Sequence, residues 1–240
     1  MLNSGVANLV VADRHGTNGV AAMDDLILPD SLREALTVDT GGATGVTRLV
    51  IAGLLEIAND RSRLEETAAL MAARLPGYAS LWHIVQASRS DHPELALRRI
   101  RQELDEGVSK SVAAAREWVI GRGGNVAVAP SSSLVEQVLR ELGDRSGMGE
   151  PTAALAGADA VGPTAILNIK GTLELAKRLP TLVVTTSLKL VPETVFADLE
   201  TSEFERIPLE LFTGVVIDGE IISPAAAGER ARHVRSVTIE

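Results

Sequence analysis

Short polar side chains follow the strand predicted over residues 125–129, in a position where they could bind an anion. Ser131, Ser132 and Ser133 follow this strand after Pro130 and precede a predicted helix. Hydroxyls and free backbone N–H groups at a helix N-terminus are suited to phosphate. Ser133 with Glu136 also fits a capping box, so at least one serine is expected to cap the helix. We therefore take Ser131 and Ser132 as candidate ligand-binding residues.

A second polar group lies in the following stretch of the α/β half. Gly162-Pro163 predicts a turn, and Thr164 offers an N-cap hydroxyl for a helix over residues 164–179. Asn168 and Thr172 are four residues apart and share one face of that helix. Both are candidates to bind a phosphorylated ligand. An ordinary strand–helix turn without a ligand is the alternative that the spacing leaves open.

Asp159 is the remaining carboxylate near this predicted pocket. It could act as a catalytic base, and capping of the loop after the strand is the alternative. The four histidines are scattered without metal-ligand spacing and there are no cysteines, so we expect no metal site and no cofactor. The sequence contains no Ser-His-Asp order, Walker loop or G-x-G-x-x-G pattern.

These side chains depend on elements that place them at one edge of a sheet. Residues 155–161 are small and apolar, as expected of a strand inside a parallel sheet. The helix predicted after it has one apolar face, formed by Ile166, Ile169, Leu173, Ala176 and Leu179. Ligands of open α/β sheets bind at the carboxyl ends of the strands. The sequence therefore predicts a site at that edge, between the two halves of the chain.

The chain divides into a helical half and an α/β half. Helical periodicity runs through residues 30–108, and short strand-like segments follow after Ser109. We predict an α/β fold in which a helical N-terminal domain, residues 1–108, is followed by a Rossmann-like parallel sheet of reduced strand number, residues 109–240. Near the C-terminus, Asp218-Gly219 predicts a hairpin. Residues 223–240 are interpreted as a mobile or partner-contacting tail.

The composition of the chain limits the kinds of molecule that it is expected to bind. Aromatic residues make up 2% of the chain against 45% hydrophobic residues, so aliphatic side chains must form the core. The net charge of −9 argues against a broad nucleic-acid surface. The longest apolar run, residues 49–55, is too short to span a bilayer, and no signal peptide is visible. We expect a soluble, cytoplasmic protein that contacts neither nucleic acid nor membrane.

Several motifs resemble those of the initiation factor 2B α/β/δ family. They are Gly157-Ala-Asp-Ala-Val161, the pattern Asn168-x-x-Gly-Thr172, and the segments 181–189 and 207–210, which together span about half of the chain. The family includes regulatory subunits of the eukaryotic factor and two sugar-phosphate isomerases, which act on methylthioribose 1-phosphate and ribose 1,5-bisphosphate. Only residues 144–154 stand where the family carries an additional strand, helix and strand, so the resemblance is to a shortened, divergent member.

The resemblance also implies roles for individual residues. Ala73-Arg74-Leu75-Pro76 is similar to the A-R-P segment whose arginine contacts substrate phosphate in the isomerases, so Arg74 is a candidate phosphate ligand. The inserted leucine departs from that pattern, and the helix dipole offers Arg74 a purely structural role. The isomerases use a cysteine and an aspartate for proton transfer, and Ala129 and Ala165 align with those positions.

Two functions follow from these observations. The first is a non-catalytic or regulatory initiation factor 2B-like protein that binds a phosphorylated sugar or nucleotide. The second is an isomerase or lyase acting on a sugar phosphate with altered catalytic residues, such as Asp159. The resemblance further implies a homodimer or higher homo-oligomer, for which the apolar segment 207–212 and the hairpin are candidate surfaces.

Overall fold

A computed structural model describes residues 28–37, 42–123, 125–130, 132–143, 149–199 and 202–234. Within that part of the chain, only helices precede the first strand, as the periodicity predicts. They are α1 (Asp30–Thr37), α2 (Gly42–Glu56), α3 (Arg61–Arg74), α4 (Ser80–Ser88) and α5 (Pro93–Ile120).

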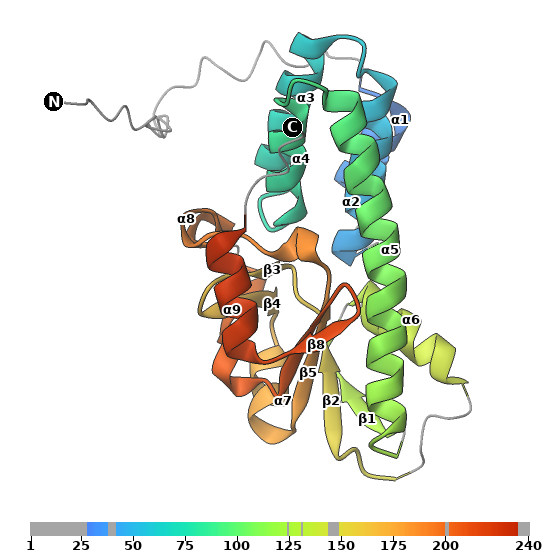
Figure 1. The fold of residues 1–240 in the computed structure, drawn as a ribbon, viewed down its shortest axis with the longest axis vertical. Helices are drawn as coiled ribbons and strands as arrows, with labels where there is room; N and C mark the ends of the chain where they lie inside the picture. The colour runs from blue at the N-terminus through green and yellow to red at the C-terminus, as the bar shows by residue number, and fades with distance from the viewer. Residues whose placement is uncertain are drawn as a thin grey trace, which may run out of the picture.

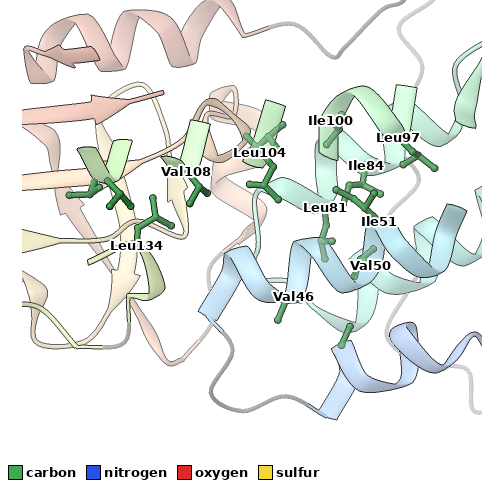
Figure 2. Packing of buried hydrophobic residues seen from close by; sticks show 14 of the residues in the cluster. Val46, Val50, Ile51, Leu81, Ile84, Leu97, Ile100, Leu104, Val108 and Leu134 are labelled. Atoms are coloured by element: carbon green, nitrogen blue, oxygen red, sulfur yellow. The ribbon is translucent and has the colours of Figure 1, made fainter. Parts of the chain in front are cut away.

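Helix α5 is longer than the sequence suggests and runs the length of the molecule (Figure 1). Its buried side chains recur every three or four residues along the whole helix. In Figure 2, Leu97 and Ile100 of α5 lie with Ile51 of α2, whereas Val108 lies near Leu134 of the sheet half. The helix is therefore continuous through residue 108, and one hydrophobic core extends from the helices to the sheet.

The main sheet has five strands in the order β1 (Val126–Val128), β2 (Ala153–Ala156), β5 (Thr181–Thr185), β7 (Gly214–Ile217) and β8 (Glu220–Ile222). The first four are parallel, and β8 is antiparallel to β7. Together with the helices before it, this sheet confirms the predicted α/β fold with a helical N-terminal region and a mainly parallel sheet.

Helices cover both faces of this sheet. Leu182 and Val184 of β5 face the core formed with α5 and α6 (Ser133–Leu142). Val183 faces the opposite core, to which α7 (Thr172–Arg178) and α9 (Pro224–His233) contribute. This alternation along β5 is the two-residue period of a strand buried on both sides.

The prediction of a helix over residues 164–179 is wrong. Strand β2 ends at Ala156, and a second, antiparallel sheet follows, in the order β3 (Ala160–Val161), β4 (Ala165–Ile169) and β6 (Phe204–Pro208). Thr164 is exposed and caps no helix, since α7 begins only at Thr172. Strand β4 buries Ile166 and Leu167 in different cores, so apolar residues occupy both of its faces and imitate helical spacing.

The interpretation of residues 223–240 as a tail is also corrected for the described part, because residues 224–233 form helix α9. Ser223 caps this helix by accepting a hydrogen bond from the backbone N–H of Ala226. Ala227 and Ala231 are buried against the sheet half. The buried side chains are only methyl groups, so the apolar face is easy to overlook in the sequence.

The remaining short elements connect the strands. They are the 3-10 helices η2 (Ser187–Lys189), η3 (Ala197–Leu199) and η4 (Leu209–Leu211), and the single-turn helix α8 (Glu193–Phe196). Segment 207–212, interpreted as an apolar surface for a partner, instead buries Ile207, Leu209 and Phe212 inside the chain. The exposed large apolar side chains at the edges of the main sheet are Val128 and Ile221.

Candidate functional site

A small pocket lies at the carboxyl ends of β2 and β5. The ends of these strands meet there with the N-termini of α2 and α6, the 3-10 helix η2 and strand β4 of the second sheet. The lining residues are Ala43, Thr44, Ser132, Ser133, Leu134, Gly157, Ala158, Asp159, Asn168, Val184, Thr185, Thr186 and Lys189. The volume in which the centre of a water molecule fits is about 20 Å³, which is room for about one water molecule.

Two helix N-termini converge on this pocket. Ser132 is the N-cap of α6, and its Oγ accepts a hydrogen bond from Val135 N at 3.3 Å. The cap is therefore one residue earlier than the predicted Ser133–Glu136 capping box. Gly42 begins α2 with a φ of +58°, and a Cβ at that glycine would lie 3.1 Å from Ser133 Oγ. The first N–H groups of a helix have no partner within the helix, and Ser132 caps only one of those of α6, so the two ends together favour an anion.

Two threonine hydroxyls in the pocket lack a partner. Thr185 and Thr186 are 1% and 2% exposed, and their Oγ1 atoms have no hydrogen-bond partner among the described residues. Both residues are among those that line the pocket. Buried polar groups are almost always hydrogen-bonded, and an unsatisfied one costs about 1–3 kcal/mol. These hydroxyls therefore point to an occupant that supplies polar atoms.

The charged groups of the pocket are Asp159 and Lys189, whose side chains are 16% and 4% exposed. Lys189 Nζ lies 3.7 Å from Asp159 Oδ1. Burial raises the pKa of Asp159, and the nearby Lys189 opposes that change. Burial likewise lowers the pKa of Lys189 against the opposing effect of Asp159. Each group is shifted toward its neutral form, which suits proton exchange with a ligand.

Lys189 was missed as a site residue. The segment Thr181–Lys189 was noted for its resemblance to a family motif, but nothing in the sequence joins Lys189 to Asp159, thirty residues earlier. The signal that could have found it is its place in the turn that follows a buried strand, where parallel sheets bind ligands. Tyr78 also lies in this electrostatic environment, since burial first, and then the charges of Asp159 and Glu203, raise its pKa.

Asn168 and Thr172 do lie together, but not on one helix. Asn168 is on β4 and donates a hydrogen bond from Nδ2 to Thr172 Oγ1, at 2.9 Å, in the first turn of α7. Thr172 Oγ1 in turn donates to Ile169 O at 3.0 Å. Only Asn168 lines the pocket, so Thr172 holds Asn168 rather than facing the ligand space.

The other residues singled out in the sequence do not line the pocket or lie outside the described residues. Arg74 is exposed at the end of α3 and is not among the residues that line the pocket. Ser131 lies outside the described residues. Ala165 is on β4 and does not line the pocket, so its alignment with a catalytic aspartate does not locate the acid–base position. The carboxylate in the pocket is Asp159.

A helical bundle joined by one long helix to an open α/β sheet, with a pocket at the strand ends, defines the class of fold. One solved structure of this class is the translation initiation factor eIF-2B of Pyrococcus horikoshii OT3, with a TM-score of 0.67 and 17% identity over 83% of this chain and 99% of that chain. Another is eIF2B beta of Chaetomium thermophilum, with a TM-score of 0.55 and 15% identity over 87% of this chain and 92% of that chain. The 5-methylthioribose 1-phosphate isomerase of Pyrococcus horikoshii OT3 is also similar, with a TM-score of 0.54 and 14% identity over 84% of this chain and 86% of that chain.

Comparison of the sequence itself finds no matching family model and no matching curated protein. The likeness therefore rests on the fold. It confirms that the resemblance noted in the sequence extends to the architecture of initiation factor 2B subunits and the isomerase.

Proposed function

We propose that the chain is an initiation factor 2B-like protein that binds a small phosphorylated molecule, a sugar phosphate or a nucleotide, in a regulatory role. The observation that carries this proposal is the convergence of the two helix N-termini with the unpartnered hydroxyls of Thr185 and Thr186. All of these groups can donate hydrogen bonds to phosphate oxygens.

Lys189 and Asp159 give the ligand its orientation. The ammonium group of Lys189 favours the phosphate end, whereas the carboxyl group of Asp159 and the amide of Asn168 suit ligand hydroxyls. The pocket has room for about one water molecule, so the walls must separate for a sugar phosphate to enter fully. Binding is therefore coupled to movement of α2 or α6 relative to the sheet.

The test is a panel of ribose 5-phosphate, ribose 1,5-bisphosphate, methylthioribose 1-phosphate and the nucleoside monophosphates, screened by thermal shift and then calorimetry. A ligand that binds the folded state raises the melting temperature by mass action. Lys189→Met should abolish that rise, and Lys177→Met is the matched control because Lys177 is exposed and paired with Glu174. If the panel leaves the melting temperature unchanged, or Lys189→Met binds as well as the parent protein, the proposal fails.

A second function, isomerisation or lyase chemistry on a sugar phosphate, is favoured by the buried Asp159–Lys189 pair. The Asp159 carboxylate would take a proton from the carbon next to a carbonyl, and Lys189 would stabilise the negative charge that develops on the carbonyl oxygen. Such a reaction exchanges the carbon-bound proton with solvent. Deuterium incorporation from heavy water, lost in Asp159→Asn, would establish it; binding without incorporation leaves the regulatory function.

Location and assembly are part of the proposal. No described helix is long and apolar enough to cross a membrane, and we place the protein in the cytoplasm as a homodimer or higher homo-oligomer. Exposed Val128 on β1 and Ile221 on β8 are the apolar contacts that the sheet edges offer. Light scattering at micromolar concentration tests the assembly, and a monomeric mass would contradict it.

A further inference from the structure

We infer that Asp218, at the tip of the β7–β8 hairpin, is the positioning residue for the pocket turn that carries Thr185, Thr186 and Lys189. The inference deepens the proposed function, because this turn supplies the pocket's cation and both unpartnered hydroxyls. Asp218 itself is absent from the pocket lining, so it acts through the turn and not on the ligand.

The carboxylate of Asp218 caps the turn from another part of the chain. Asp218 Oδ1 accepts a hydrogen bond from Ser187 N at 3.0 Å. Ser187 is the first residue of η2, and Lys189 is its last. Thr186, the residue before η2, makes no side-chain capping bond to it. Asp218 therefore satisfies an N–H group that the turn leaves free, as an N-cap side chain does in a helix.

Helix α5 holds the hairpin against this turn. Ser111, fully buried in α5, donates a hydrogen bond from Oγ to Thr185 O at 2.8 Å. The same Oγ accepts a hydrogen bond from Gly219 N at 3.2 Å. One serine thus joins the end of β5 to the hairpin tip, and the two hydrogen bonds fix the position of Asp218 relative to Ser187.

Two glycines permit this close approach. Gly107 lies inside α5, and a Cβ there would overlap Asp218 Oδ1 and reach within 3.4 Å of Thr186 Cγ2. A Cβ on Gly219 would lie 2.8 Å from Lys110 Cβ. A glycine weakens the interior of a helix, so Gly107 is best explained by the need to admit the Asp218 carboxylate. The Thr186 atom that this Cβ would meet is the methyl carbon, Cγ2.

The backbone at Asp218 allows a clean pair of substitutions. Its φ of +49° is left-handed, which glycine and asparagine tolerate. Asp218→Asn keeps both the turn and an oxygen that can accept from Ser187 N. Asp218→Gly keeps the turn but removes the acceptor. Glu220→Gln is the matched control, because Glu220 is on the same hairpin and pairs with Arg230 at 2.6 Å, away from the pocket turn.

The experiment has a ligand-independent readout and a binding readout. Amide hydrogen exchange of residues 185–190 should accelerate about tenfold in Asp218→Gly, as expected for the loss of one hydrogen bond. Asp218→Asn and Glu220→Gln should stay within about threefold of the parent protein. Affinity for ribose 5-phosphate, measured by calorimetry, should fall most in Asp218→Gly and little in Asp218→Asn and Glu220→Gln. All variants should retain a cooperative melting transition.

Unchanged exchange of residues 185–190 in Asp218→Gly overturns the inference. Equal acceleration in Asp218→Gly and Asp218→Asn also overturns it, because the hydrogen-bond acceptor would then not be the cause. If the parent protein does not bind ribose 5-phosphate or any other member of the panel, the proposed function fails, and the exchange comparison still decides the role of Asp218. Gly107→Ala provides an independent arm: its added methyl should displace Asp218 and accelerate the same amides.

Discussion

Lys189 Nζ lies 3.7 Å from Asp159 Oδ1, and both side chains are largely buried at the edge of the main sheet. Removing either member leaves the other as a buried charge without a partner, which costs more than the pair contributes. Both the chemistry of the pocket and the stability of the fold therefore depend on this pair.

Lys189→Met should destabilise the protein by about 3 kcal/mol at pH 8, because it leaves the Asp159 carboxylate buried without its cation. Burial already raises the pKa of Asp159, and loss of Lys189 raises it further. A raised folded-state pKa gives stability that is present at low pH and lost as the pH rises through that pKa. Urea denaturation between pH 4 and pH 8 should show this loss in the variant, and a pH-independent deficit would contradict it.

His83 should make the protein sensitive to acid. Its Nε2 lies 2.9 Å from Leu190 O, and burial lowers its pKa from 6.5 to about 4. The unfolded state then takes up the proton first, so stability is complete above pH 6.5 and falls by about 3 kcal/mol as the pH drops to 4. His83→Gln, which can still donate to Leu190 O, should remove this slope. Equal slopes in the two proteins would show that His83 is not responsible.

Gly171→Ala should destabilise the protein by about 1 kcal/mol, since Gly171 has a φ of +104° where β4 turns into α7. The matched control is Gly45→Ala. Gly45 is helical, and a Cβ there meets no atom within 4 Å, so alanine should stabilise α2 by about 0.5–1 kcal/mol. Thermal denaturation of both variants tests the contrast in sign, and a stabilising Gly171→Ala would refute the assignment of β4 and α7.

Leu104→Ala should cost about 3 kcal/mol, because Leu104 is fully buried in the core that joins the helices to the sheet (Figure 2). Leu95 is on the same helix but 57% exposed, so Leu95→Ala should change the free energy of unfolding by no more than about 0.5 kcal/mol. Chemical denaturation measures both values. Similar costs at the two positions would mean that α5 is not packed as described.

The helical half could be read from the sequence because its apolar residues keep one period for several turns. Ile166 and Ile169 have that same spacing on β4, a strand with apolar residues on both faces, so the periodicity predicts a helix there. Helix α9 was missed because alanines carry its buried face. Asp159 and Ser132, which line the pocket, could be named as candidates from their places after strands. The contacts of Lys189 and Asp218 join distant segments, which no local pattern records.

The unbroken course of α5 has a consequence for any attempt to separate the two halves. At 1.5 Å per residue, its 28 residues form a rod about 42 Å long. A chain divided at residue 108 would cut this rod near its middle, exposing its apolar stripe on one fragment and parting Gly107 from Ser111. We therefore expect neither fragment to fold alone, and expect the pair to regain structure only by complementation when mixed.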